Sequence, residues 1–268
     1  MEEFRVIEKL KPGGQKEVYF IEHPNYGKCI LKRGRCSSSN SLERIKREVN
    51  ILREVDSYYF PKNYEANFFN NGEFIIFEEN IESIPLSEMK HTFIGQENKA
   101  LKLFLSLIEG LRILWDRRII HRDLKPDNIL IKEDGQPVII DLGIARILDD
   151  ESLTLTIQQN GPCTPVYASP EQLRNSKCSI DMRTDFFALA IIISELVLGK
   201  HPFAPEVVGE GMGILDNLIN GKYKLEFSGV RLSNGLEKIV KKLLQIEPYQ
   251  RIRSYEKLEE ELTKLLAR

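Results

Sequence analysis

The sequence lacks several features that would assign it to particular classes of protein. Its 268 residues hold 38 Lys and Arg against 40 Asp and Glu, so no excess of positive charge favours binding to nucleic acid. No apolar run reaches the length of a membrane span, and the opening "MEEFRVIEKLK" has no signal-peptide core. The four cysteines show no CxxC or metal spacing. We therefore expect a cytoplasmic protein with reduced thiols and no membrane segment.

What the sequence does contain is an ordinary globular composition with a change of pattern along the chain. Residues 1–80 are rich in short, β-prone runs separated by Gly, Pro and Asn, with one amphipathic helix expected at 41–55. Helical patterns dominate afterwards, over 97–118, 170–175, 181–198, 211–220, 233–246 and 254–267. The pattern predicts an α+β fold with two lobes, a small β-rich lobe (1–80) with one main helix and a larger, mainly helical lobe (81–268).

The segment "IIHRDLKPDNILI" at 119–131 holds the residue types that phosphoryl transfer needs. Asp123 would accept the proton of a substrate hydroxyl, and Asn128, five residues later, would bind magnesium. Lys125, between them, would neutralise the transferred phosphoryl group. Taken alone, the segment is also compatible with a polar turn between a helix and a strand.

Three further charged residues extend this set. Asp141 ends the apolar run of "IIDLGIAR", where it would hold magnesium against nucleotide phosphates. Lys32 ends the run "CIL" on an expected strand, from which it would reach the phosphates, and Glu48 on the next helix would pair with it. Each of these residues alone could be an ordinary surface charge; their order along the chain favours a site.

With these motifs in one order, the chain resembles the protein kinases over nearly its whole length. The segment "CTPVYASPE" (163–171) is similar to the family's substrate-docking loop, and "DMRTDFFALA" to the buried helix whose Asp, here Asp185, supports the catalytic loop. The resemblance implies that Thr164 contacts the catalytic residues and that Arg251 pairs with Glu171. Lys125, "DLGIAR" and "YASPEQ" are similar to the eukaryotic-like serine/threonine kinases of bacteria.

The resemblance also implies ATP and Mg²⁺ as cofactors and an adenine pocket between the lobes. Ile30 would lie above the adenine ring, Leu130 would form the floor and Phe77 would lie at the back of the pocket. The nucleotide-binding residues implied are Gly13, Gly14, Val18, Ile30, Lys32, Glu48, Phe77, Glu78, Asn80 and Leu130. The glycine-rich loop departs from the family, since Lys11 and Lys16 stand where two of its three glycines occur. These lysines would either add positive charge near the phosphates or be solvated.

The activation segment, 141–171, contains three hydroxyl residues that would be modified. Ser152, Thr154 and Thr156 lie in its polar stretch, and Arg122 would receive a phosphate from one of them. We therefore expect self-phosphorylation at one of these positions. A merely solvated polar loop is the alternative.

Three functions are compatible with the sequence. The first is ATP- and magnesium-dependent phosphorylation of serine and threonine in protein substrates, including the chain itself. The second is a kinase-like, nucleotide-binding scaffold (a pseudokinase) with little turnover, which the altered glycine loop and the bulky Ile30 and Phe77 favour. The third, a small-molecule kinase, fits less well because such kinases tend to lack the docking loop. The sequence identifies neither the protein substrate nor the oligomeric state.

Overall fold

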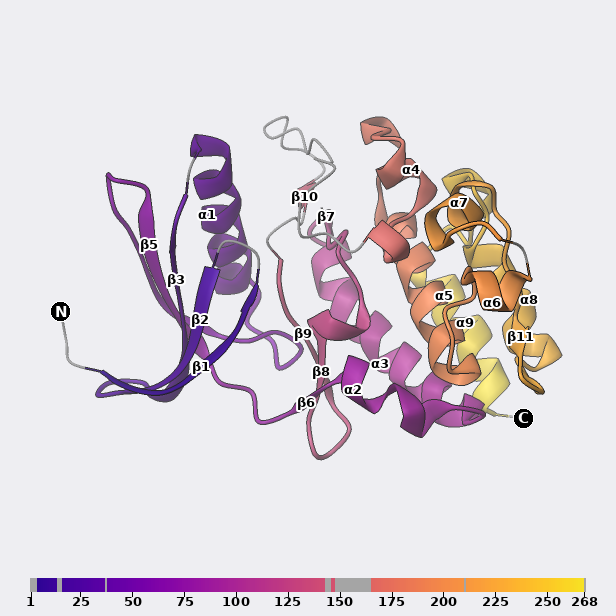
Figure 1. Ribbon diagram of the computed structural model, residues 1–268, viewed down its shortest axis with the longest axis horizontal. Coiled ribbons are helices and arrows are strands. Elements are labelled where there is room, and N and C mark those ends of the chain that lie inside the picture. The colour runs from indigo at the N-terminus through magenta and orange to yellow at the C-terminus, as the bar shows by residue number, and fades with distance from the viewer. Residues whose placement is uncertain are drawn as a thin grey trace.

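The protein consists of a small lobe built on a β-sheet and a larger helical lobe, and the chain passes from one to the other after strand β5 (Figure 1). A computed structural model describes residues 4–13, 16–36, 38–142, 146–147, 165–209 and 211–267. The predicted two-lobed α+β fold is confirmed.

The small lobe is a five-stranded antiparallel sheet in the order β1-β2-β3-β5-β4. Helix α1 (Ser39–Glu54) connects β3 to β4 and begins at Ser38, whose side chain accepts a hydrogen bond from the Ser41 backbone. It covers the helix predicted at 41–55 except for Val55, which follows its last residue. The strands are β1 (Arg5–Gly13), β2 (Lys16–His23), β3 (Gly27–Arg35), β4 (Asn63–Phe68) and β5 (Glu73–Glu79).

The two faces of this sheet carry different apolar clusters. Alternate residues of a strand point to opposite faces, and the inner face packs against α1 through Ile45 and Val49, which contact Phe74 and Ile76. The outer face holds a separate cluster formed by Ile21, Cys29, Leu31 and Phe77. Lys32 pairs with Ile76 across β3 and β5 and therefore belongs to the inner face, beside α1.

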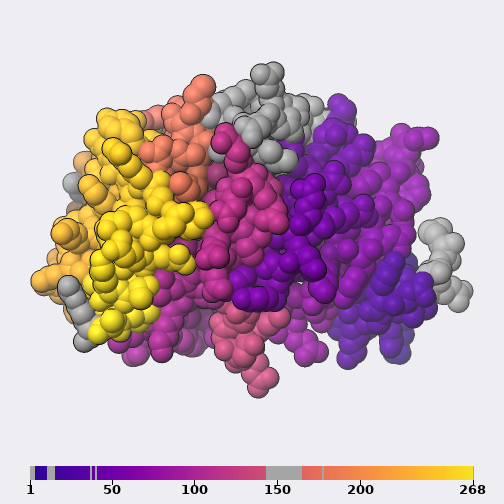
Figure 2. Space-filling view, turned by 180° about the vertical axis from the view of Figure 1, so that it is seen from behind, coloured from indigo at the N-terminus to yellow at the C-terminus, as the bar shows by residue number. Residues whose placement is uncertain are grey.

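The larger lobe is organised around two long helices, α3 (Glu97–Trp115) and α5 (Met182–Leu198). Every residue of α5 from Thr184 to Leu198 is buried, because other elements cover it all round. The other helices are α2 (Leu86–Met89), α4 (Pro170–Leu173), α6 (Pro205–Val208), α7 (Ile214–Ile219), α8 (Asn234–Leu243) and α9 (Tyr255–Leu266). From behind, α9 in yellow and the small lobe in indigo and purple lie at opposite ends of the molecule (Figure 2).

Short strands and 3-10 turns complete the larger lobe. The strands are β6 (Ile84–Pro85), β7 (Ile119–Ile120), β8 (Ile129–Ile131), β9 (Pro137–Ile139), β10 (Arg146–Ile147), β11 (Glu226–Phe227) and β12 (Val230–Arg231). The 3-10 turns are η1 (Lys90–Phe93), η2 (Pro126–Asn128), η3 (Pro165–Tyr167), η4 (Lys177–Ser179) and η5 (Pro248–Gln250). Strands β6, β8 and β9 form one sheet, and β8 is the end of the segment 119–131.

The sequence pattern located the long helices and overestimated some shorter ones. The helix expected at 211–220 covers only Ile214–Ile219, because Gly213 precedes its first turn and Gly221, at positive φ, follows its end. The described residues include no helix that is both long and apolar enough to cross a membrane.

Candidate active site

Lys32 lies between two carboxylates, one from helix α1 and one from strand β5. Its Nζ is 2.7 Å from Glu78 Oε2 and 3.5 Å from Glu48 Oε1. Both glutamates are almost completely buried, at 1% and 2% exposure. The Lys32–Glu48 pair expected from the sequence is therefore present but long, and the closer partner is Glu78.

Glu48 is shared with a second lysine. Lys16, at the start of β2, forms an ion pair with Glu48 Oε2, and only 17% of its side chain is exposed. Of the two roles considered for Lys16, simple solvation is wrong, since its ammonium group is held inside the site. Two lysines and two glutamates thus form one cluster on the inner face of the sheet.

This arrangement keeps Lys32 charged. Burial opposes the ammonium charge, but attraction to Glu78 and then to Glu48 outweighs it and raises the pKa of Lys32 above its ordinary value. Asp141 contributes in the same direction, which places that carboxylate within electrostatic reach of Lys32. Lys32 is therefore a permanent positive charge facing the larger lobe.

The segment 119–131 of the larger lobe brings three of the predicted residues into contact. Lys125 Nζ is 3.2 Å from Asp123 Oδ2, and Asn128 Nδ2 donates to that same oxygen at 3.0 Å. Asn128 also donates to the Asp123 backbone carbonyl at 2.8 Å, which closes the turn formed by η2. Burial raises the pKa of Asp123, the positive charge of Lys125 lowers it, and the negative charge of Asp141 raises it. The net result is a pKa above the ordinary value of an aspartate.

Asp185 fixes the backbone of this segment through hydrogen bonds. Its carboxylate, 1% exposed at the start of α5, accepts from the backbone N–H groups of His121 (3.0 Å) and Arg122 (2.9 Å). It also accepts from Trp115 Nε1 at 2.9 Å. Arg122 has a φ of 71°, which costs free energy in a non-glycine residue, and its bond to Asp185 helps to maintain it. The structure thus brings Asp185 against the catalytic loop.

Asp141 follows β9 and also has positive φ, at 65°. The next residue, Leu142, is 1% exposed in the core of the larger lobe, whereas Asp141 is exposed. The left-handed backbone turns the carboxylate out of the core while its neighbour stays anchored. Because Asp141 raises the pKa of both Lys32 and Asp123, it lies within electrostatic reach of both lobes.

Glu171 and Arg251 form a buried, two-pronged ion pair. Arg251 Nη1 and Nη2 lie 2.7 and 2.8 Å from the two carboxylate oxygens, and Thr184 donates to Glu171 at 2.9 Å. Arg251 also donates to three backbone carbonyls, those of Arg183, Gln245 and Ile246. The pair joins α4 to the end of the lobe at η5.

The placement expected for Phe77 is wrong. Its ring lies on the outer face of the sheet with Ile21, Cys29 and Leu31, and contacts the rings of His23, Phe4 and Tyr26. It therefore cannot line the back of a pocket on the inner face. The next residue, Glu78, points to that face instead, because side chains alternate along a strand. This one-residue difference replaces an aromatic ring by a carboxylate in the site.

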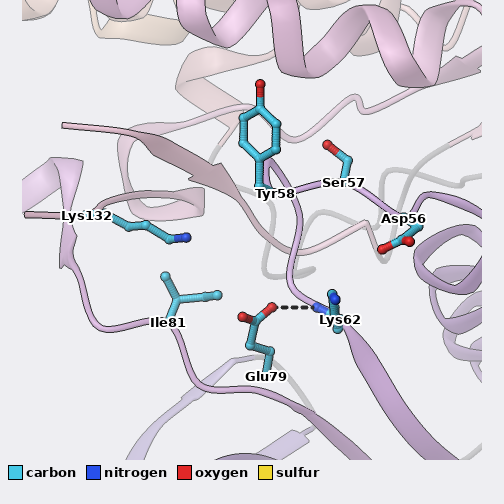
Figure 3. A pocket seen from close by; sticks show the side chains of 7 residues that line it. All are labelled: Asp56, Ser57, Tyr58, Lys62, Glu79, Ile81 and Lys132. Carbon is cyan, nitrogen blue, oxygen red and sulfur yellow. Dashed lines mark hydrogen bonds between the residues drawn. The ribbon is translucent and has the colours of Figure 1, made fainter. Parts of the chain in front are cut away.

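The adjacent Glu79 points to the opposite face of the sheet from Glu78, because side chains alternate along strand β5. It lines a cavity together with Tyr58, Ile81 and Lys132, among others (Figure 3). Its Oε2 accepts a hydrogen bond from the Lys62 backbone at 3.1 Å (Figure 3). Neighbouring glutamates of β5 thus have different surroundings.

Apolar side chains flank the inner face near Lys32. Val18 and Ile30 are half-buried residues of β2 and β3, and Val18 pairs directly with Lys32. In the larger lobe, Ile129 and Ile131 point into the core, whereas Leu130 between them is half-buried and points the other way. Asn80, also half-buried, follows β5 in the connection between the lobes.

Several predicted residues lie outside the described part of the chain. These are Gly14, Ser152, Thr154, Thr156 and Thr164. Gly13 ends β1, where its backbone pairs with Lys16.

One polar group near the docking loop was missed by sequence reasoning. Glu195, 7% exposed within α5, accepts from Tyr167 Oη at 2.5 Å and pairs with Lys90 at 2.8 Å. The signal was present, since Glu195 interrupts an otherwise apolar run. A charged residue at such a position requires a buried partner.

Comparison with known proteins agrees with this geometry. The family profile described as "Protein kinase domain" matches residues 5–262, so the chain belongs to the protein kinase family. It is 30% identical over 210 residues to serine/threonine-protein kinase pkn2 of Myxococcus xanthus, covering 75% of this chain and 25% of that protein. It is 31% identical over 219 residues to serine/threonine-protein kinase PknA of Nostoc sp., covering 74% of this chain and 37% of that protein.

A plant protein is similar over a longer part of the chain. Serine/threonine-protein kinase AtPK2/AtPK19 of Arabidopsis thaliana is 27% identical over 280 residues, covering 98% of this chain and 54% of that protein. The chain therefore spans between a quarter and about half of the length of these relatives.

Proposed function

We propose that this chain is a serine/threonine protein kinase that transfers the γ-phosphoryl group of ATP to hydroxyl groups of proteins. The observation that carries the proposal is the contact of Asp123 with both Lys125 and Asn128, opposite the charged Lys32. The names of the bacterial and plant relatives support serine and threonine as acceptors. Because phosphoryl transfer depends mainly on positioning and electrostatics, these fixed charges are the parts that matter.

The residues present suit a magnesium ion. Mg²⁺ prefers oxygen ligands, and Asp141 offers a carboxylate while Asn128 offers an amide oxygen. Asn128 uses its Nδ2 to bind Asp123, which leaves its Oδ1 as the atom that would contact a metal. Bound there, the ion would neutralise the charge of the nucleotide phosphates.

The side chains of this protein would divide the remaining work between the two lobes. Asp123 would accept the proton of the substrate hydroxyl, and Lys125, 3.2 Å away, would stabilise the negative charge beside it. Lys32 would attract the phosphates of the nucleotide. Val18, Ile30 and Leu130 would enclose the adenine ring with apolar surface.

The proposal is tested by transfer of labelled phosphate from ATP to a generic protein substrate in the presence of magnesium. We expect Asp141→Ala to abolish transfer while the protein stays folded, since a metal-binding carboxylate is lost. Full activity of Asp141→Ala would show that this residue does not bind the metal. A circular dichroism melt of both proteins serves as the folding control.

A nucleotide-binding scaffold with little turnover is the second candidate function. It is favoured by one observation: Lys32 is closer to Glu78 than to Glu48, at 2.7 against 3.5 Å. A lysine held by another carboxylate is less available to phosphate. Nucleotide binding without any phosphate transfer would support this candidate over the first.

We further propose that the kinase phosphorylates itself in the activation segment, at Ser152, Thr154 or Thr156. Arg122, two residues after the buried strand β7, is the candidate receiver of that phosphate. After incubation with ATP and magnesium, mass spectrometry should find at least one of these residues phosphorylated. The Asp123→Ala protein should remain unmodified under the same conditions, and an unmodified segment in the active enzyme would contradict the proposal.

The cysteines support a reducing compartment such as the cytoplasm. Cys29, Cys36 and Cys178 are free thiols, and Cys178 is exposed. Burial raises the pKa of Cys29 and Cys36, which keeps both protonated and unreactive at neutral pH. An exposed free thiol is typical of proteins that do not meet an oxidising environment.

A further inference from the structure

One half of the Glu78 carboxylate has no partner, although the side chain is buried. Glu78 is 2% exposed, and its Oε2 forms the 2.7 Å ion pair with Lys32. Its Oε1 is inaccessible and has no hydrogen-bond partner among the described residues. A buried acceptor without a donor costs free energy. A ligand donor that displaces the surrounding atoms and reaches this oxygen would remove that cost.

The position of Glu78 defines which part of a ligand it can meet. It pairs with Ile30 across β3 and β5, and it lies one residue from the end of β5. Under the proposed function, on which this inference rests, Ile30 and Leu130 enclose the base and Lys32 meets the phosphates. Glu78 lies beside both Ile30 and Lys32, so it faces the edge of the base nearest to the phosphate-binding lysine.

The chemistry of purines makes a carboxylate at this edge selective. Adenine carries an amino group at C6, which donates hydrogen bonds, whereas guanine and hypoxanthine carry a carbonyl there, which only accepts. We propose that Glu78 selects the nucleobase, with Oε1 accepting a hydrogen bond from the C6 amino group of adenine and repelling a C6 carbonyl. A site built to bind such a donor rejects an analogue that lacks it, because its buried polar atom is left unpaired.

The experiment compares the binding of two diphosphates by isothermal titration calorimetry. ADP and inosine diphosphate share ribose and phosphates but differ at C6 and at the adjacent N1, which accepts in adenine and carries a proton in hypoxanthine. Inosine diphosphate also lacks the additional 2-amino group of guanine. The ratio of their dissociation constants therefore cancels any effect that Glu78 has on phosphate binding through Lys32. We expect the wild-type protein to bind ADP at least tenfold more tightly, the range of one hydrogen bond to a charged group.

Two substitutions at Glu78 and one beside it assign the selectivity to this side chain. Glu78→Gln keeps the shape, removes the charge and can offer its amide N–H groups to a carbonyl, so the preference for ADP should fall tenfold or more. Glu78→Met, which keeps the volume without any polar atom, should also lose the preference. Glu79→Gln is the matched control, because Glu79 faces away from the site. This variant should prefer ADP over inosine diphosphate by the same factor as the wild type.

The possible results separate this inference from the proposed function. Equal affinity of the wild type for the two diphosphates would overturn the inference, as would a preference that changes less than tenfold in both Glu78 variants. Either result is compatible with phosphate transfer and leaves the proposed function standing. Selective binding without transfer would support the inference and contradict the kinase activity. Binding of neither diphosphate would overturn both.

Discussion

At the scale of residues, the site is a balanced cluster of buried charges. Lys16 and Lys32 face Glu48 and Glu78, so the cluster is neutral before any ligand arrives. Buried charges are tolerated when they are paired, and removal of one leaves another uncompensated. Carboxylates from two different elements therefore position Lys32, the lysine that would bind phosphate.

The pKa of Asp123 leads to a prediction about pH. The pKa is raised by burial, against the opposing effect of Lys125, and the residue must be unprotonated to accept a proton. Activity should therefore fall as the pH drops through this raised pKa, at a higher pH than an ordinary aspartate would give. Lys125→Met removes the opposing charge and should move the acid limb of kcat/KM to still higher pH.

The pH dependence of kcat/KM, measured for the wild type and for Lys125→Met, checks this prediction. The loss of activity that Lys125→Met causes does not affect the pH at which the acid limb falls. An acid limb that stays in place, or that moves to lower pH in the variant, would show that Asp123 is not the group observed.

Phe77 shows where residue-scale prediction failed. Strand β5 has buried side chains on both faces, so its sequence contains no clear alternation of polar and apolar residues. Only the pairing with β3 decides which residue faces α1, and a shift by one residue exchanges the faces. Lys32, Asp123 and Asp141 were easier to identify, because their motifs have fixed spacing.

At the scale of elements, helix α5 organises the larger lobe. It is buried along nearly its whole length, and its polar residues connect it to the functional segments: Asp185 to the catalytic loop, Thr184 to Glu171 and Glu195 to Tyr167. One rigid helix therefore positions three segments that are distant in sequence.

The Glu171–Arg251 pair should be the most sensitive connection between these elements. Arg251→Met leaves the Glu171 carboxylate buried without its partner, so we expect the free energy of unfolding to fall by about 3–5 kcal/mol. The double variant Glu171→Met/Arg251→Met should lose less than the two single variants together, since it leaves no unpaired charge. Urea unfolding measures all of these values.

An exposed pair nearby provides the control. Arg174 and Glu247 are 2.9 Å apart but nearly half exposed, so Arg174→Met should change the free energy of unfolding by less than about 1 kcal/mol. Equal effects of Arg174→Met and Arg251→Met would contradict the role assigned to burial.

Element prediction from sequence succeeded where a long pattern was available. Helices α1, α3, α5 and α9 have amphipathic or continuous apolar patterns over three turns or more. The short elements β6, α2 and α6 were not predicted, because two to four residues carry no measurable period. They form through contacts with the rest of the lobe.

At the scale of the whole molecule, the site exists only when both lobes are in place. The small lobe contributes Lys32 and Glu48, and the larger lobe contributes Asp123, Asn128 and Asp141. The order of these motifs in the sequence was sufficient to predict the two lobes. It could not predict the partner of Lys32, which depends on how β5 pairs with β3.

Nucleotide binding should stabilise the molecule as a unit, in a way that depends on magnesium. A ligand that binds only the folded state adds about 2.7 kcal/mol to the free energy of unfolding at 100 times its dissociation constant. We therefore expect ATP with magnesium to raise the melting temperature clearly more than ATP alone, and Asp141→Ala to remove the difference. An identical shift with and without magnesium would contradict the metal site.

The central claim is that Asp123 serves phosphate transfer to protein hydroxyls, and the most direct test is an assay with labelled ATP, magnesium and a generic protein substrate. Wild type and Asp123→Ala are compared at equal concentration, with melting curves to show that both are folded. We predict transfer to serine and threonine by the wild type and a loss of about 10²- to 10⁴-fold in the variant, the usual contribution of a catalytic base. Equal transfer by the two proteins, or none by the wild type, would contradict the claim.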